Sequence, residues 1–493
     1  MAVRNPPNTA RAMPISVHNT LTRQTAPFVP LQAGKVGMYL CGPTVYDDCH
    51  IGHLMGPVLF DAVARWFRVR GLAVRLVNNI TDIDDKIINR SIATGEAWDS
   101  ITKRYTAQYL SYLARLKVTT VTDHPKCSDF IPQMVTYIQE LISSGRAYAA
   151  ADGVYYDVQK QEGYGKLSGR KLNEMVAGSR IERDSALHHP ADFALWKQAK
   201  PGEPAWDSPW GKGRPGWHIE CSVMSNETLG ATFDIHAGGD DLKFPHHENE
   251  IAQGEAHGGK YACCWMHNGL IQYEGRKVGK SDERMKDQAF RKQFQADHLL
   301  DTYGATTVRF LLLQGHYRRP NDFAPTALTA ARTALGRMHQ QLGGLLAQPG
   351  EPQLDEVLAR TLPAAAAKHR EAFVAAMDDD FNTGQAIAQL FTLLTEARKA
   401  AGAEATAILT LVRDLGRFIG LFQPGDEADT AADATSAGAD DGTLQQVMGL
   451  VLEIRQQARA NRDFATSDLI RDRLKGAGIT VKDAKDGATW ERG

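Results

Sequence analysis

Hydrophobic residues near the start of the chain form short runs separated by a stretch with helical spacing. Residues 35–41 (KVGMYLC) are a largely apolar run closed by Gly42 and Pro43, which predicts a buried strand. Between Leu59 and Phe67 the apolar positions recur at helical spacing, and residues 74–77 (VRLV) predict a second strand. A strand, a helix and a strand within about 45 residues predict a βαβ unit in a parallel sheet with a right-handed crossover.

The pattern then changes twice before it returns to a strand. Residues 100–150 follow a helical period, whereas residues 151–215 are irregular and rich in Gly, Pro and Trp, as in an insertion that folds on its own. Residues 232–236 (TFDIH) predict another strand, and a helix is expected around Glu248. These elements predict an α/β fold with a Rossmann-type parallel sheet and an inserted connective subdomain.

From about residue 325 onward the chain is Ala-rich and almost wholly helical in pattern. Two apolar stripes at helical spacing are Leu328, Ala331, Leu335, Met338 and Leu342, and Ile408, Leu411, Leu415 and Ile419. Together they predict an all-α helix bundle that follows the α/β part.

Two segments lack any clear period. Residues 1–33 are interpreted as an N-terminal extension, and residues 424–442, with six acidic residues and no basic one, are predicted to be a disordered acidic linker. Beyond the linker, apolar positions from Leu444 to Ile454 and a basic stretch that continues to Trp490 predict a small C-terminal domain. A small domain on a flexible tether is typical of binding to a large partner.

Composition excludes several classes of protein. Lys and Arg number 56 against 58 Asp and Glu, so the net charge of -2 excludes a globally basic nucleic-acid coat. There is no apolar run of about 18 residues and no secretory signal, which favours a cytoplasmic enzyme. The six cysteines are too sparse for a disulfide framework and contain no CxxC pair, so any metal site must combine distant residues.

The turn after the first predicted strand contains His50-Ile51-Gly52-His53 at the start of a helix. Free backbone N–H groups and the helix dipole make such a position a phosphate site, and the two histidines can donate to phosphate oxygens. By itself, a His-x-x-His pair is also typical of solvated histidines or of a fragment of a metal site. The residues alone therefore leave these interpretations open.

Two signatures in order favour the phosphate interpretation. The segment His50 to His53 matches the HIGH signature of class I aminoacyl-tRNA synthetases and related nucleotidyltransferases, and Lys277-Val278-Gly279-Lys280-Ser281 resembles their second, KMSKS signature. By this resemblance His50 and His53 hold the phosphates of ATP, while Lys277 and Lys280 stabilise the charge on the leaving pyrophosphate.

Four residues with metal-binding side chains lie far apart in the sequence. His246 and Glu250 are four residues apart, so on a helix they project from one face, a common half-site for zinc. Cys41 ends the first strand, and Cys221 precedes the second α/β stretch. The carboxyl ends of parallel strands meet at one sheet edge, but the residues alone are equally compatible with core thiols and surface polar groups.

Longer segments extend the resemblance to the cysteinyl-tRNA synthetase family over nearly the whole chain after the N-terminal extension. They are residues 39–47, 79–86, 217–222, 244–250, 315–318 and 489–490. The resemblance implies one zinc per chain bound by Cys41, Cys221, His246 and Glu250. It also implies that Thr81, Trp217 and His236 surround the bound cysteine and that Asp241 meets the ribose of ATP.

The resemblance further implies the reaction and its partners. ATP, with Mg²⁺, and L-cysteine form a cysteinyl-adenylate, and the cysteinyl group passes to tRNA(Cys); a monomer is expected, and no membrane is involved. The expected domains are an N-terminal extension (1–33), two Rossmann halves (34–130 and 212–272), a connective insertion (131–211), a KMSKS-loop and stem-contact region (273–324), a tRNA-binding helix bundle (325–423), the linker (424–442) and an anticodon-binding domain (443–493).

The chain departs from the family pattern in several places, among them Asp282-Glu283-Arg284 after the second signature, where Leu-Gly-Asn is usual. The second signature has Val278 and Gly279 where Met and Ser are usual, Ala237 replaces a common Gly, and the first signature is a full HIGH where the family often ends in Asn. Two rival functions are the related ligase that joins cysteine to an amino-sugar in mycothiol synthesis and a non-catalytic RNA-binding paralogue. The bundle and basic C-terminal region disfavour the first, and the retained HIGH, Lys280 and zinc ligands disfavour the second.

Overall fold

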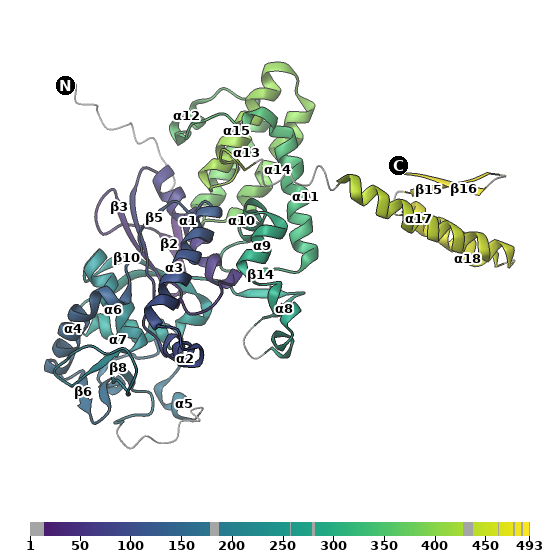
Figure 1. Ribbon diagram of the computed structural model, residues 1–493. Coiled ribbons are helices and arrows are strands. Elements are labelled where there is room, and N and C mark those ends of the chain that lie inside the picture. The colour runs from purple at the N-terminus through teal and green to yellow at the C-terminus, as the bar shows by residue number, and fades with distance from the viewer. Residues whose placement is uncertain are drawn as a thin grey trace. The chain divides into compact units, whose positions relative to one another are not determined.

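The structure is a computed structural model that describes residues 14–177, 187–256, 258–278, 282–426, 437–461, 463–476, 479–484 and 487–492. The chain divides into two compact units, Met1–Asp426 and Glu427–Gly493 (Figure 1). Among the described residues, no helix combines the length and the apolar character needed to cross a membrane.

A five-stranded parallel sheet lies at the centre of the first unit and confirms the predicted Rossmann-type fold. Its strands run in the order β11 (Ala262–Asn268), β10 (Phe233–Gly239), β3 (Lys35–Leu40), β4 (Ala73–Asn78) and β5 (Val121–Asp123). The strand order therefore reverses between β3 and β10, and this topological switch point is where open α/β sheets bind their ligands.

Helices cover both faces of this sheet. Alternate residues of β3 enter two hydrophobic cores: Met38 and Leu40 belong to one and Tyr39 to the other. The helices that connect or cover the strands are α1 (Ile51–Val69), α2 (Asp85–Thr94), α3 (Trp98–Arg115), α4 (Ile131–Ser143), α6 (Trp217–Leu229) and α7 (His246–Glu255). Both faces are buried, as the apolar runs of β3 and β4 require.

The insertion is more regular than its composition predicted. Four short strands form an antiparallel sheet: β6 (Ala147–Ala150), β7 (Gly153–Tyr156), β8 (Phe193–Gln198) and β9 (Gly213–Pro215), with α5 (Leu172–Ala177) between β7 and β8. Tyr156 and Trp196 share a core with Cys221 and Trp265, so the insertion packs on the central fold and does not form a core of its own. Strands of three to six residues are too short to show a clear period.

Part of the predicted N-terminal extension also belongs to the folded body. Strands β1 (Ser16–Asn19) and β2 (Gln24–Pro27) form a hairpin, and Val17 is buried. The Asn19 side chain donates to the carbonyl of Cys263 at 3.0 Å and accepts from the Trp265 N–H at 3.1 Å, which adds the hairpin to the edge strand β11. The extension prediction is thus wrong for residues 14–33; residues 1–13 lie outside the described part.

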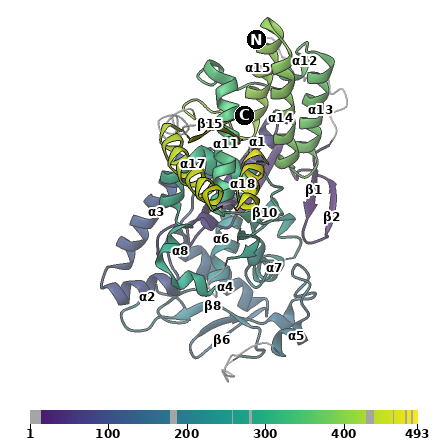
Figure 2. The ribbon, with the colours of Figure 1, turned by 90° about the vertical axis from the view of Figure 1, so that its right-hand side faces the viewer.

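A helical region follows the sheet and confirms the predicted bundle (Figure 2). Its helices are α8 (Gln288–Lys292), α9 (Ala296–Tyr303), α10 (Ala305–Leu313), α11 (Pro325–Leu342), α12 (Leu354–Ala359), α13 (Ala364–Asp378), α14 (Thr383–Lys399) and α15 (Gly402–Phe418). A small sheet consists of β12 (Ile271–Tyr273), β13 (Arg276–Lys277) and β14 (Asn321–Asp322). Its strands come before α11 in the chain, and β13 carries Lys277 of the second signature.

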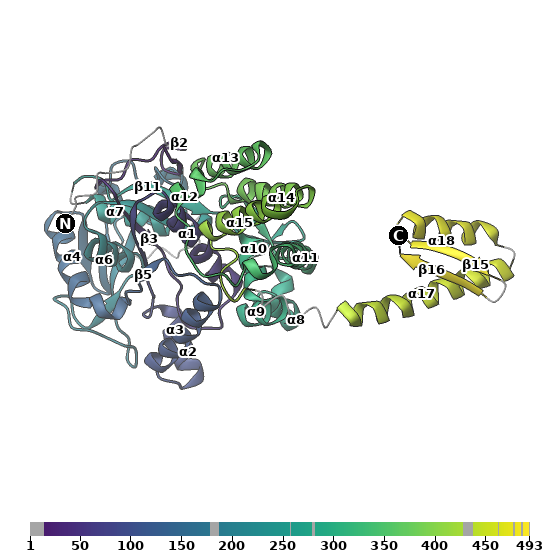
Figure 3. The ribbon, with the colours of Figure 1, turned by 90° about the horizontal axis from the view of Figure 1, so that it is seen from above.

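The second unit consists of α17 (Ala437–Ala460), α18 (Phe464–Gly476) and the antiparallel hairpin of β15 (Ile479–Ala484) and β16 (Gly487–Arg492), which packs on α18 (Figure 3).

The prediction of a disordered linker over residues 424–442 is wrong at both ends. Lys117 donates to the carbonyl of Pro424 at 3.0 Å and pairs with the buried Asp426, so residues 424–426 belong to the first unit. The helix α17 already begins at Ala437, so residues 437–442 of the predicted linker are helical. Residues 427–436 lie outside the described part.

Candidate active site

The predicted metal ligands meet at the switch point of the central sheet. Cys41 follows β3, Cys221 lies on α6, and His246 and Glu250 lie one turn apart on α7. One ligand atom from each of the four lies within 4.8 Å of the others, and all but the partly buried Cys41 are buried. The structure therefore brings together residues that are up to 209 positions apart in the sequence.

Two of the distances between these ligand atoms match the edges of a zinc tetrahedron. Tetrahedral Zn–S and Zn–O bonds of about 2.3 and 2.1 Å imply about 3.8 Å between two sulfurs and about 3.6 Å between a sulfur and an oxygen. Cys41 Sγ lies 3.7 Å from Cys221 Sγ and 3.6 Å from Glu250 Oε1. His246 Nε2 lies 3.1 Å from the same Glu250 oxygen. The two distances that involve sulfur match the tetrahedral edges, and the nitrogen–oxygen distance is shorter than the about 3.4 Å that a tetrahedral zinc would set. The chemistry of the four donors fits a zinc ion.

The local backbone explains how Cys41 reaches this position. Gly42 donates its N–H to Asn79 Oδ1 at 2.8 Å, which ties the end of β3 to the residue that follows β4. A Cβ on Gly42 would lie 1.6 Å from the Asn79 carbonyl oxygen. Only glycine allows this close approach, so the Gly after Cys41 is a requirement of the turn.

A layer of polar and aromatic side chains holds the ligands. Glu250 Oε2 lies 2.7 Å from His236 Nε2 and accepts from the Tyr261 hydroxyl at 3.1 Å, which leaves Oε1 for a metal. His246 Nδ1 lies 3.0 Å from His218 Nδ1, so one of the two donates and the Nε2 of His246 faces the cluster. Such outer contacts orient metal-binding histidines and carboxylates.

Burial sets the charge states of the four ligands. Burial raises the pKa of the Cys41 thiol well above its ordinary value and lowers the pKa of His246 to about 3. For Cys221 the hydrogen bond with Cys41 lowers the pKa, but burial and the Glu250 charge outweigh it, so the pKa is raised. For Glu250, burial alone raises the pKa, and the His236 and His246 imidazoles reverse the direction. The raised pKa values of both thiols favour their protonated forms, and binding of a cation would favour the thiolates.

A second set of four ligand atoms overlaps the first. It shares Cys41 and Glu250 and adds His236 and His247, both fully buried. His247 Nδ1 lies 2.8 Å from His267 Nε2. The sequence analysis missed His247, His218 and Tyr261; the first two stand next to predicted residues, and that proximity was the only available signal. The first set has two thiols at the sulfur–sulfur spacing of a tetrahedral zinc site, and it is the better zinc site.

The residues expected around bound cysteine fall into two groups. Trp217 begins α6, is 37% exposed, and stacks on the His246 ring with centroids 4.3 Å apart, while His236 touches Glu250. Thr81 is buried and contacts the turn that follows Cys41. Its N–H donates to the Pro43 carbonyl at 3.1 Å, and its own carbonyl accepts from the Val45 N–H at 3.2 Å. All three therefore adjoin the candidate metal centre or the turn that carries it.

The first signature lies at the start of α1, in the turn that follows the metal ligand Cys41. His50 is the N-cap, and its Nδ1 accepts from the Gly52 N–H at 3.1 Å, while His53 Nδ1 accepts from the His50 N–H at 3.4 Å. The two rings stack with centroids 3.8 Å apart. The helix terminus and the partly exposed imidazoles form the kind of end that binds phosphate.

The second signature is described only in part. Lys277 is exposed on β13, and Lys280 lies outside the described residues. The segment that follows is tied to the first signature: Ile51 donates to the Phe294 carbonyl at 2.9 Å, and Ala296 donates to the Cys49 carbonyl at 2.8 Å. Asp241 is exposed in the turn after β10, at the same carboxyl edge of the sheet.

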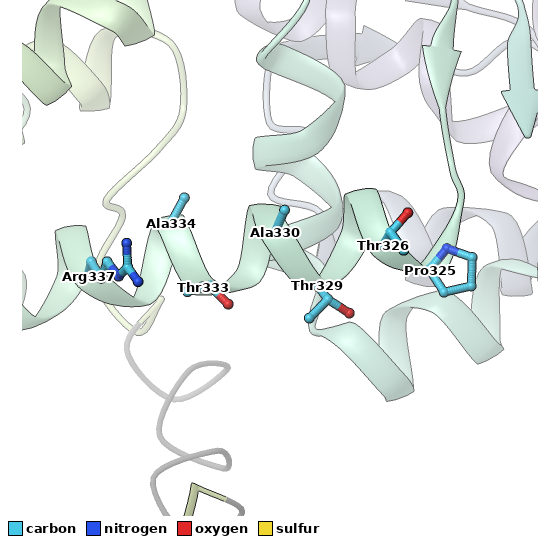
Figure 4. Close-up of a pocket in the computed structure, with 7 residues that line it drawn as sticks. All are labelled: Pro325, Thr326, Thr329, Ala330, Thr333, Ala334 and Arg337. Atoms are coloured by element: carbon cyan, nitrogen blue, oxygen red, sulfur yellow. The ribbon is translucent and has the colours of Figure 1, made fainter. Parts of the chain in front are cut away.

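A separate shallow depression of about 620 Å³ lies on the outer face of α11 (Figure 4). Alanine and threonine side chains between Pro325 and Arg337 line it. None of the predicted site residues is among them, so this depression is not part of the candidate active site.

Comparison with known proteins defines first the class and then the family. A model of the class I (C) tRNA synthetase catalytic domain matches residues 27–333, a DALR domain matches residues 372–423, and a cysteinyl-tRNA ligase anticodon binding domain matches residues 450–490. Residues 27–333 of the first unit thus have the catalytic fold of a class I aminoacyl-tRNA synthetase. Solved structures agree on this fold: a Mycobacterium tuberculosis methionyl-tRNA synthetase in complex with methionyl-adenylate has a TM-score of 0.54 at 13% identity, over 78% of this chain and 89% of that chain. A leucyl-tRNA synthetase complex of Agrobacterium radiobacter has a TM-score of 0.57 at 12% identity, over 82% of this chain and 86% of that chain.

Relatives with full-length similarity identify the family. The cysteine–tRNA ligase of Chromohalobacter salexigens is 45% identical and covers 97% of this chain and 99% of its own length. That of Stutzerimonas stutzeri is 46% identical with the same coverage of both chains. The chain belongs to the cysteine–tRNA ligase family.

Proposed function

We propose that this protein uses ATP to join L-cysteine to tRNA(Cys) through a cysteinyl-adenylate. The observation that carries the proposal is the Cys41, Cys221, His246 and Glu250 cluster at the switch point of a class I synthetase fold. The turn that begins at Cys41 leads to the His50–His53 helix end. Membership of the cysteine–tRNA ligase family supports the same reaction.

The cluster suits the selection of cysteine. A zinc ion, one per chain, would be held by Cys41, Cys221, His246 and Glu250 and would bind the substrate as a thiolate. Shape alone separates cysteine from serine poorly, because the two differ by one atom. A serine hydroxyl stays protonated near neutral pH and is a far weaker zinc ligand, so a thiol-binding site supplies the discrimination. Thr81, Trp217 and His236 would orient the rest of the amino acid.

The residues at the nucleotide end would act on ATP, which enters with Mg²⁺. The cysteine carboxylate attacks the α-phosphorus, the bond to the bridging oxygen breaks, and pyrophosphate leaves. His50 and His53 would hold the phosphates, Asp241 the ribose, and Lys277 and Lys280 the negative charge that builds on the leaving group.

The helical region and the second unit would bind tRNA, with the second unit near the anticodon. The DALR and anticodon-binding matches support these roles. A cytoplasmic location and a monomeric state are part of the same proposal. The matches at residues 372–423 and 450–490 also disfavour the mycothiol ligase alternative, which needs no tRNA-binding extension.

Cysteine-dependent exchange of pyrophosphate into ATP, with metal analysis of the same purified sample, tests the activation step. We expect exchange with cysteine, far less with serine, and one zinc per chain. Absence of exchange by a folded, zinc-loaded protein would favour the RNA-binding paralogue. Charging of tRNA(Cys) then separates the synthetase from a ligase that transfers cysteine to an amino-sugar.

The role of Lys280 predicts a specific kinetic defect. Lys280→Ala should slow adenylate formation by orders of magnitude and leave cysteine affinity nearly unchanged, because the lysine charge meets the transition state. Single-turnover kinetics measure the two quantities separately. Lys286→Ala, in the same region and ion-paired with Glu283, is the matched control and should keep the wild-type rate. A large rise in the cysteine dissociation constant with intact turnover would contradict the role.

The role of the second unit predicts the result of a truncation that ends at Asp426, where the first unit ends. The truncated protein should keep cysteine-dependent exchange near the wild-type rate. It should lose most of its charging efficiency through weaker tRNA binding, and the binding that remains should depend less on salt, since fewer phosphate contacts are made. Unchanged charging at physiological salt would assign tRNA recognition to the helical region alone.

A further inference from the structure

The helix that carries two of the four candidate zinc ligands is also held from its opposite face. Successive residues of an α-helix are about 100° apart, so Glu248 points about 200° away from His246. Glu248 is 1% exposed and takes no part in the ligand cluster. Its carboxylate faces a loop of the insertion, residues 161–170.

Three backbone N–H groups of that loop converge on the Glu248 carboxylate. Oε1 accepts from Gly165 at 3.0 Å and from Leu167 at 3.3 Å, and Oε2 accepts from Ser168 at 2.8 Å. Gly165 has a φ of 98°, a conformation that favours glycine and turns the loop so that its N–H groups face one point. Buried carboxylates persist only when such donors replace water, so the carboxylate and the loop conformation depend on each other.

Further contacts fasten the loop along both ends of α7. The Tyr164 hydroxyl donates to Asn249, which follows Glu248, and the Arg170 guanidinium lies over the Phe244 ring, 4.4 Å from its centroid. At the far end of the helix, Glu255 accepts from Gln161 Nε2 at 3.1 Å. The loop therefore follows α7 over its whole length, and Glu248 is its buried centre.

We infer that Glu248 is a positioning residue that fixes the metal-binding face of α7 by clamping this loop of the insertion. His246 and Glu250 come from α7, whereas Cys41 and Cys221 come from other elements, so a small shift of α7 alters the spacing between the two pairs. The insertion thereby controls the geometry of the cysteine-binding zinc. This inference rests on the proposed function for its kinetic consequence and on the ligand cluster alone for its effect on metal retention.

Glu248→Gln tests the clamp, because it keeps the shape but turns an amide NH₂ toward backbone N–H groups. In the zinc-loaded, full-length protein we expect about tenfold faster loss of zinc to a chelator, the scale of effects for groups that orient metal ligands. In pyrophosphate exchange, the KM for cysteine should rise several-fold while kcat at saturating cysteine changes less. Glu174→Gln, at a 68% exposed carboxylate on α5 of the insertion, is the matched control and should leave both values near wild type.

A lower thermal midpoint with unchanged zinc loss and unchanged KM would overturn the inference, since Glu248 would then only stabilise the fold. If Glu248→Gln does not fold, Tyr164→Phe removes one hydroxyl contact from the same loop and should shift zinc loss and KM in the same direction by a smaller factor. No shift in Tyr164→Phe would also overturn it. Failure of the proposed function is distinct: the wild-type protein would then show no cysteine-dependent exchange, while zinc release from the variants would still be measurable.

Discussion

Two buried clusters of charged and polar side chains lie on the two faces of the central sheet, and they differ in how their charges are balanced. On one face, Asp61 of α1 is fully buried together with Arg309 of α10. On the other, the Cys41, Cys221, His246 and Glu250 cluster combines two thiols, an imidazole and a carboxylate without a lysine or arginine among them.

The Asp61 cluster is neutralised by its own partners. Arg309 Nη2 donates to Asp61 at 2.5 Å and Arg65 Nε at 2.7 Å, and the N–H groups of Thr119 and Thr120 donate at 3.1 Å each. Burial alone would raise the pKa of Asp61, but the two guanidiniums outweigh it and lower the pKa to about 2. Because the arginines balance the charge of Asp61, this cluster joins α1 to the helical region without requiring a bound cation.

The charges of the ligand cluster are not balanced by positively charged partners within the cluster. Its thiols carry raised pKa values in the absence of a cation, and full deprotonation would leave three negative charges in one buried pocket. The comparison teaches that burial of ionisable groups is not itself a sign of function. An uncompensated set of soft and acidic donors indicates a cation-binding site, whereas a compensated set indicates a structural role.

The largest effect should come from breaking the uncompensated cluster. Cys221→Ser should lower zinc content and slow cysteine activation together, by orders of magnitude, while the thermal midpoint changes little. Metal analysis and pyrophosphate exchange measure both. Cys263→Ser, at a partly buried thiol on β11 outside the cluster, is the control and should behave as wild type. Full zinc content with normal activation in Cys221→Ser would remove this residue from the site.

Breaking the compensated cluster should instead destabilise the fold. Asp61→Asn leaves the Arg309 guanidinium buried without its counter-charge, which costs about 3–5 kcal/mol in the free energy of unfolding. Urea denaturation measures this loss, and zinc content per folded chain should stay at the wild-type level. Asp301→Asn removes the partner of Arg115 at a site where the carboxylate is 68% exposed, and this control should change stability by less than about 1 kcal/mol.

The same cluster predicts a pH dependence. Because the pKa of Asp61 is about 2 in the folded protein and about 3.9 when unfolded, its ionisation stabilises the fold above the unfolded value and loses this effect as the pH falls through the folded value. The linkage amounts to about 2.6 kcal/mol. The stability difference between wild type and Asp61→Asn should therefore shrink by about 2 kcal/mol between pH 5 and pH 2 and by the remainder below pH 2. A constant difference over this range would show that Asp61 titrates normally.

The sequence predicted those parts of the molecule whose pattern lies in neighbouring residues. The strands at 35–41 and 74–77 are apolar runs bounded by turn residues, and they occur as β3 and β4. His246 and Glu250 could be paired from their spacing on one helix, whereas joining them to Cys41 and Cys221 required the family resemblance. Local sequence patterns were therefore enough to predict the Rossmann-type fold and two of the four metal ligands.

What the sequence could not show depends on contacts that leave no local pattern. Asp61 and Arg309 are 248 residues apart, and nothing near either one indicates the other. Glu248 is bound by backbone N–H groups, which every residue except proline has, so its partners have no sequence signature. Strand β11 and the strands of the insertion were missed, the latter because strands of three to six residues show little periodicity.

The smallest effect should come from the outer guanidinium of the compensated cluster. Arg65 is only 13% exposed, and besides Asp61 it donates to the Lys117 carbonyl at 3.0 Å and to Thr119 Oγ1 at 2.6 Å. Arg65→Met keeps the packing of the stem and leaves Asp61 paired with Arg309, so the carboxylate is still neutralised. We expect a loss of about 1 kcal/mol in the free energy of unfolding, because water can replace part of what the partly exposed guanidinium provides. Urea denaturation beside Asp61→Asn measures the ratio of the two effects. If Arg65→Met costs as much as Asp61→Asn, a single guanidinium does not compensate Asp61, and the cluster depends on both arginines for its balance.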